Sequence, residues 1–305
     1  MPGWSDYSNQ NIANYMAGAA PFPTSAPSAT NPPPIFLALF QVAPTADAGT
    51  GATEVPAANG YARQQVAGSL TTSATTASGS AVLTFSAVPA WIVAGMAILD
   101  LTTAGVIPAA TRVLSTTGTT VTMNANATGG GVGSGDRISF SAFAPATGST
   151  GTNASILPGG FVNTNATITY AQATGAGWGT VQAFGAYDAL TVGNFLWWDW
   201  LGAFKWIPWS GSSASPCVMT TDLAADVPAN ASNVVVQQKY GGTLPTTAGS
   251  WNGVLTTAGA ATNTFNVGVN TTTTGGGLFR QITQQAIAGN VTPSFAAGQL
   301  TLTDA

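Results

Sequence analysis

The sequence predicts a mainly β protein: a discontinuous β-sandwich or jelly-roll-like core, two inserted β modules and a short N-terminal helix. Helical signals are scarce, because Thr, Val, Gly, Asn and Pro dominate and no long stretch repeats apolar residues at helical spacing. Short runs of β-branched and aromatic residues lie between Gly, Pro and Asn turns, for example at 113–123, 168–171 and 300–303, and such runs are typical of strands. The 305 residues are enough for two or three small cores.

The N-terminal elements are predicted from residue spacing and proline content. Residues 6–17 carry apolar side chains at loosely helical spacing, with Ser5 or Asp6 available as the N-cap and Gly18 as the stop, so we expect a short helix there. Six prolines between positions 21 and 34 favour an extended arm laid across a surface, because proline fixes φ and lacks a backbone donor. The apolar run at 35–42 then predicts a short buried strand.

Low-complexity stretches divide the rest of the chain. Residues 71–80 and 147–152 flank the segment 81–143, and residues 210–216 begin a second comparable segment. We therefore expect both segments to be insertions into one discontinuous core. The predicted parts are 1–80 (helix, proline-rich arm and first part of the core), 81–143 (inserted β module), 144–215 (second part of the core), 216–283 (second β insertion) and 284–305 (closing core strand).

The surface of this protein must carry very little charge. Only 5% of the residues are charged, against roughly 25% in ordinary soluble domains, while 45% are hydrophobic. So few charges give little repulsion between molecules, and an isolated chain would expose apolar patches. The composition therefore predicts self-association into a homo-oligomer. The single cysteine, Cys217, excludes an intramolecular disulfide, so packing and oligomerisation must supply the stability.

Charge and hydropathy also argue against two classes of partner. The net charge is −4 and the six basic residues lie singly along the chain, so no basic patch is available to neutralise a nucleic-acid backbone. No apolar run reaches the roughly 18 to 20 residues that span a bilayer, and residues 1–4 lack the features of a signal peptide. We expect neither nucleic-acid nor membrane binding, and function without translocation.

No catalytic, metal or cofactor site is predicted. The chain has no histidine, one cysteine and ten scattered acids, whereas metal sites need clustered ligands. Asp222 and Asp226 are the closest acids in sequence, and general acid–base chemistry by such a pair is conceivable. Their position before Val227 and Pro228 favours turn caps instead. The glycine pattern at 133–136 favours a hairpin turn over a phosphate loop, because no helix follows it.

Tryptophan is concentrated in one segment. Five of the nine tryptophans lie between positions 197 and 209: Trp197, Trp198, Trp200, Trp206 and Trp209. One interpretation is a strand pair whose rings are buried in the core or at a subunit contact, because interfaces are enriched in tryptophan. The other is a carbohydrate platform, since flat aromatic rings stack on sugar faces. In a strand, alternation would place Trp198 and Trp200 on one face and Trp197 and Asp199 on the other, so both interpretations can hold in part.

Several short segments of the predicted core share a pattern with a known family. They are NIANY (11–15), IFLALF (35–40), DAGTGATEV (47–55), GYARQ (60–64), NATITY (165–170), WGTV (178–181), FGAYDA (184–189), GNFL (193–196), Lys205 and SFAAGQLTL (294–302). They resemble small virion proteins of tailed bacteriophages that are usually labelled tail-fibre proteins. The resemblance covers somewhat less than half of the chain. The segment 93–138 also looks like a small β module common in phage structural proteins. The proline-rich stretch and residues 217–283 depart from the short members of the family.

The resemblance implies a non-enzymatic structural protein on the exterior of a phage virion, and it brings no catalytic residue and no cofactor. A tail fibre or other tail appendage is the first expectation. A capsid decoration protein is the alternative, since a self-associating β core and an arm crossing a neighbouring subunit would suit it. A module that binds host glycan through the cluster at 197–209 is the second alternative. The implied partners are neighbouring virion proteins and copies of the same chain, as a trimer, because phage appendages commonly follow three-fold axes.

Overall fold

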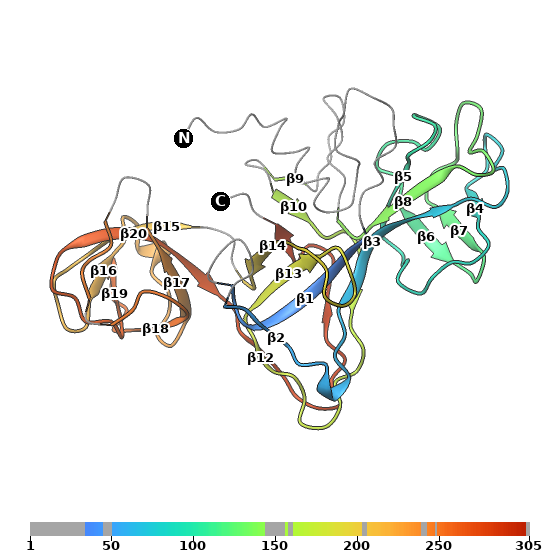
Figure 1. Ribbon diagram of the computed structural model, residues 1–305. Coiled ribbons are helices and arrows are strands. Elements are labelled where there is room, and N and C mark those ends of the chain that lie inside the picture. Colours follow the sequence, from blue (N-terminus) through green and yellow to red (C-terminus); the bar gives the residue numbers. More distant parts are fainter. Residues whose placement is uncertain are drawn as a thin grey trace.

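The computed structural model describes residues 34–44, 51–143, 156–157, 161–202, 206–238, 243–247 and 249–302 (Figure 1). Strands account for 42% of the structure and helical turns for 3%, against roughly 30–35% helix in ordinary globular proteins, so the prediction of a mainly β protein is confirmed. The helical turns described are η1 (Ala58–Gly60) and η2 (Ala224–Asp226), and no helix in this part of the chain is long and apolar enough to cross a membrane. The predicted helix at 6–17, and the proline-rich arm before Pro34, lie outside the described residues.

The centre of the molecule is a seven-stranded antiparallel sheet. Its strands follow the order β14-β13-β1-β3-β8-β5, and the short β2 pairs with β1. The predicted strand at 35–42 is confirmed as β1, and it lies inside the sheet because its apolar run is buried at most positions. The bounds are β1 Ile35–Val42, β2 Thr53–Glu54, β3 Gln64–Thr71, β5 Ala97–Asp100, β8 Arg137–Ser141, β13 Ala183–Tyr187 and β14 Phe195–Trp200.

The C-terminal segment of the chain runs back along residues 161–181. β21 (Gln285–Ile287), β22 (Ser294–Phe295) and β23 (Thr301–Leu302) pair antiparallel with β12 (Gly179–Val181), β11 (Ile168–Thr169) and β10 (Phe161–Asn163), and β10 also pairs with β9 (Ile156–Leu157). Trp178 and Leu300 are buried in this region, in the same cluster as Leu37 of β1. The last described strands therefore close the packing around β1.

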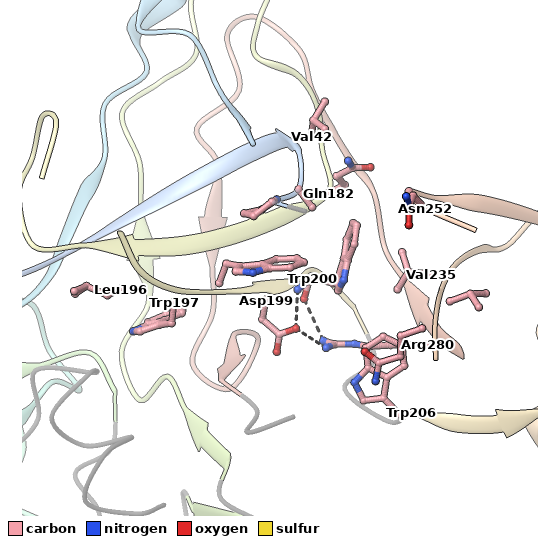
Figure 2. Close-up of a pocket in the computed structure, with 16 residues that line it drawn as sticks. Val42, Gln182, Leu196, Trp197, Asp199, Trp200, Trp206, Val235, Asn252 and Arg280 are labelled. Carbon is pink, nitrogen blue, oxygen red and sulfur yellow. Dashed lines mark hydrogen bonds and ion pairs between the residues drawn. The ribbon is translucent and has the colours of Figure 1, made fainter. Parts of the chain in front are cut away.

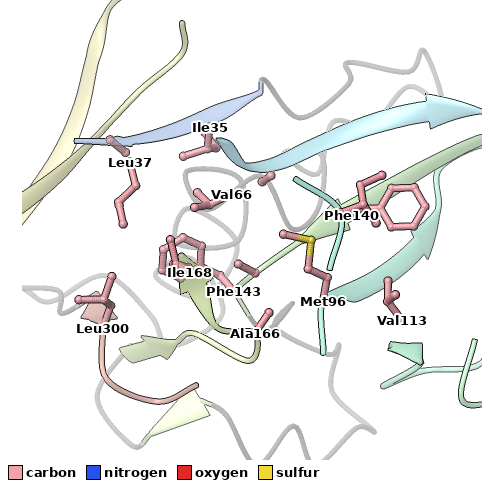
Figure 3. Close-up of a cluster of buried hydrophobic side chains, with 14 of the residues drawn as sticks. Ile35, Leu37, Val66, Met96, Val113, Phe140, Phe143, Ala166, Ile168 and Leu300 are labelled. Atoms are coloured by element: carbon pink, nitrogen blue, oxygen red, sulfur yellow. The ribbon is translucent and has the colours of Figure 1, made fainter. Parts of the chain in front are cut away.

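Residues 81–143 share their core with the large sheet. β4 (Val82–Thr84), β7 (Thr120–Met123) and β6 (Val113–Thr116) form a three-stranded sheet of their own, but β5 and β8 extend the large one. One cluster of buried side chains contains Ile35 and Val66 together with Met96, Val113 and Phe140 (Figure 3). The segment 81–143 is thus packed as one unit with the core of the large sheet. The domain boundaries at 81 and 143 remain a prediction.

A closed six-stranded barrel follows, in the order β15-β16-β19-β18-β17-β20. It lies at one end of the molecule, with the β4-β7-β6 sheet at the other (Figure 1). Its hydrophobic cluster is separate from that of the large sheet and contains Trp209, Phe265 and Phe279. Because Trp209 belongs to this cluster, the barrel begins before the predicted insertion boundary at 216. The bounds are β15 Ile207–Gly211, β16 Val218–Thr220, β17 Asn233–Gln237, β18 Leu255–Ala258, β19 Thr264–Val267 and β20 Gly275–Ile282.

The chain leaves the large sheet for the barrel and returns at one joint. Gly202, after β14, forms an isolated bridge with Ile282 at the end of β20, and the Thr283 amide donates to the Leu201 carbonyl at 2.8 Å. Gly202 has a φ of 118°, and a Cβ at this position would lie 2.6 Å from the Thr283 nitrogen. Only glycine allows this close approach of the two strands without strain.

Candidate functional site

β14 distributes its tryptophans over two faces. Trp197 and Asp199 are buried, whereas Trp198 and Trp200 are half-buried, in the predicted alternation. The Trp197 ring packs edge-to-face with the rings of Phe143 and Phe184, with distances between ring centres of 5.7 and 5.9 Å. Trp197 is therefore a core residue of the large sheet.

Trp206 and Trp209, which follow β14 in the sequence, differ in their burial. Trp209 is buried inside the barrel, with its ring 5.3 Å from that of Trp251. Trp206, one residue before β15, is half-buried. The sequence cluster at 197–209 is thus not one surface in the structure: Trp197 and Trp209 belong to two separate cores, and Trp198, Trp200 and Trp206 remain partly accessible.

These three accessible tryptophans line a cleft of about 590 Å³ between β14 and the barrel, which we call the tryptophan cleft. Figure 2 shows Trp200 and Gln182 of the sheet side, and Trp206, Val235 and Asn252 of the barrel side, around the same space. The ring centres of Trp198 and Trp200 are 5.4 Å apart, and the planes of the two rings form an angle of 69°. The lining is therefore largely aromatic and aliphatic, with amide side chains between.

A buried ion pair closes the inner side of the tryptophan cleft. Arg280 of β20 binds the Asp199 carboxylate of β14 at 2.5 Å and donates to the Trp200 carbonyl at 3.2 Å (Figure 2). The two side chains are only 2% and 8% exposed, so water screens their charges very little. The pair joins the barrel to the large sheet across 81 positions of sequence, a contact that sequence reasoning missed because no local pattern connects the two residues.

A second group of polar contacts, centred on Arg63, connects three of the segments that resemble the phage family. Arg63 binds both carboxylate oxygens of Glu54 at 2.8 and 2.9 Å, and its guanidinium lies 3.4 Å from the centre of the Tyr187 ring. It also donates to the carbonyls of Ala189 and Val192 in the loop between β13 and β14. These contacts hold the loop against β2, which is a structural role.

The two acids singled out in the sequence lie at and just before a helical turn. Asp222 is exposed and Asp226 lies in the turn η2, in keeping with a turn rather than a catalytic pair. Among the described residues, no group of three or more His, Cys, Asp or Glu side chains is placed to hold a metal ion. Asp136 of the glycine pattern accepts a hydrogen bond from the Gly133 amide at 2.7 Å, which closes the turn before β8.

The structure instead brings Asp136 next to Asp100, because β5 pairs with β8. One oxygen of Asp100 accepts the amides of Thr102 and Thr103 at 2.8 and 2.9 Å. The other oxygen is buried without a hydrogen-bond partner in the described part of the chain. Burial raises the pKa of Asp100, the bonds from Thr103 and Thr102 lower it in part, and Asp136 raises it further.

We expect Asp100→Asn to raise the free energy of unfolding at pH 7 by about 1 kcal/mol, since it removes a poorly satisfied buried charge and keeps the oxygen that accepts the two amides. In the wild type the folded state holds the proton of the Asp100 carboxyl more tightly than the unfolded chain does, because the pKa of Asp100 is raised on folding. Stability should therefore fall as pH rises from about 4 through the raised pKa, and the variant should lose this component. Urea denaturation at several pH values measures both effects. The exposed control Asp222→Asn should change neither, and an unchanged pH profile in Asp100→Asn would contradict the assignment.

Comparison with known proteins finds one similarity, over part of this chain. Residues 108–211, roughly a third of the 305, are similar to a phage fibre protein, so the resemblance to phage tail-fibre proteins is confirmed over this stretch. The matching family is described as the podophage GP4 fiber I protein gp80. The matched range runs from before β6 through β15, and it includes Trp197 to Trp209 but not Arg280. No curated protein and no solved structure matches.

Proposed function

We propose that this protein is a non-enzymatic structural component of a tailed-phage virion, located on the particle exterior in a tail fibre or another tail appendage. The observation that carries the proposal is the similarity of residues 108–211 to a phage fibre family. The β-rich architecture and a chain in which only 5% of the residues are charged support a role in assembly. Copies of the same chain, as a trimer, and neighbouring virion proteins are the proposed partners.

The number of copies per virion tests the location. A tail appendage should be present in a small number of copies, because a tail offers few attachment points, whereas a capsid decoration protein covers the whole shell. We expect quantitative gel staining against the major capsid protein to give a handful of copies per particle, and gold-labelled antibodies to mark the tail. A ratio near one copy per capsid protein, or one per three, would instead identify a decoration protein. Sedimentation of the purified chain should give a trimer, and a stable monomer at micromolar concentration would contradict the proposed self-association.

A further inference from the structure

Two asparagines of this chain are followed by glycine, and the structure gives them opposite surroundings. The pairs are Asn59-Gly60 and Asn252-Gly253. Asparagine is chemically labile, most of all before glycine, which has no Cβ to hinder its own backbone nitrogen. We propose that Asn252 is a site of spontaneous deamidation in the folded protein and that Asn59 is protected. This inference adds a covalent modification that the proposed structural role does not include.

The reaction takes place within the chain and needs only water. The Gly253 nitrogen gives its proton to hydroxide or water and attacks the side-chain carbonyl carbon, Cγ, of Asn252. The new C–N bond closes a succinimide ring, while the bond from Cγ to Nδ2 breaks and the nitrogen leaves as ammonia. Water then opens the ring at one of its two carbonyls, which yields aspartate or isoaspartate. The net change converts one asparagine and one water into one acidic residue and one ammonia.

Asn252 and Gly253 are placed for this attack. Both are exposed, in a bend between β17 and β18 on the barrel side of the tryptophan cleft (Figure 2). Neither the Asn252 side chain nor the Gly253 amide forms a hydrogen bond with another residue in the described ranges. Gly253 has a φ of 85°, and a Cβ at this position would meet no atom within 4 Å. The two reacting groups are therefore accessible to water and can approach each other without breaking a contact.

Asn59 is held on both sides of its peptide group. It is half-buried, and its side-chain Nδ2 donates to the Gly177 carbonyl at 2.8 Å. Its own carbonyl accepts the Trp178 indole N–H and the Thr174 amide, each at 2.9 Å. Turning the side chain toward the Gly60 nitrogen breaks the bond to Gly177. Deamidation of Asn59 therefore requires local opening of the structure around Trp178, which is only 2% exposed.

The modification would change the charge of the tryptophan cleft. Deamidation of Asn252 takes the net charge of the chain from −4 to −5 and places the new carboxylate on the barrel side of the cleft. Because only 5% of the residues are charged, one added charge is a large relative change and gives a separate acidic isoform. The electrostatics of this surface should therefore change with the age of the protein.

Peptide mapping by mass spectrometry tests the inference on the full chain, incubated folded in mildly alkaline buffer. We expect aspartate and isoaspartate to accumulate at position 252 at least about tenfold faster than at position 59, because Asn59 reacts only from an opened form. The rate at Asn252 should rise with pH, since base removes the proton of the Gly253 amide. In urea both positions should react at similar rates, because unfolding removes the protection of Asn59 and glycine follows both asparagines.

Two variants identify the source of the acidic isoform in isoelectric focusing. Asn252→Gln keeps an amide at the exposed position but must close a larger ring, so the isoform should not form, and the unfolding midpoint should stay that of the wild type. Asn263→Gln changes another exposed asparagine of the barrel and should leave the isoform unchanged. The inference is overturned if both asparagines react equally fast in the folded protein, if Asn252 stays intact, or if the isoform persists in Asn252→Gln. None of these outcomes alters the copy number, so the structural proposal is tested separately.

Discussion

Arg280→Met is expected to lower the free energy of unfolding by about 3–5 kcal/mol, because it leaves the buried Asp199 carboxylate without its counter-charge. The Arg280 side chain is 2% exposed and that of Asp199 is 8% exposed, so neither can recover solvation by a small movement. The substitution also removes the donor to the Trp200 carbonyl. Urea denaturation followed by tryptophan fluorescence measures the loss.

Two further variants make the ion-pair prediction specific. Arg137→Met removes an exposed arginine that bonds Ser69, and it should change stability by no more than about 0.5 kcal/mol. The double variant Asp199→Asn with Arg280→Met removes both charges, so it should be clearly more stable than the sum of the single changes indicates. Additive effects of the two single changes would show that the pair does not act as a unit.

Phe140→Ala is expected to destabilise the large sheet by about 3–5 kcal/mol, the usual loss for deleting a buried phenylalanine. Phe140 of β8 is fully buried between Gly68 of β3 and Ile98 of β5 in the strand register. Its ring makes edge contacts with Phe85 at 5.8 Å and Trp91 at 6.4 Å. Because Phe85, Ile98 and Phe140 belong to the same hydrophobic cluster as the buried side chains of β1, hydrogen exchange should increase in β1 as well as within 81–143.

The barrel supplies the matched control for the Phe140 prediction. Phe265→Ala deletes a fully buried ring that lies 5.0 Å from Phe279 in the separate barrel cluster. It should raise hydrogen exchange in β16 to β20 and leave β1, β5 and β8 protected, since two cores can unfold separately. Exchange confined to 81–143 in Phe140→Ala would mean that this segment is an independent module rather than part of the large core.

Local patterns predicted much of the fold and part of the site. The apolar run at 35–42 became β1, and alternation in β14 placed Trp197 with Asp199 and Trp198 with Trp200 as expected. These predictions succeeded because strand formation and the facing of side chains depend on neighbouring residues. Which of the five tryptophans at 197–209 share a surface could not be predicted, since Trp197 belongs to the core of the large sheet and Trp209 to that of the barrel.

The sequence by itself determined that this protein is β-rich, nearly uncharged and similar to phage fibre proteins, because composition, alternation and short segments are properties of the chain alone. Only the tertiary structure decided which residues meet. Asp199 and Arg280 are 81 positions apart, and Asp100 and Asp136 come together through the pairing of β5 with β8. The tryptophan cleft exists because the barrel returns to the sheet at Ile282. Such contacts depend on strand order and register across the whole chain, which no local periodicity encodes.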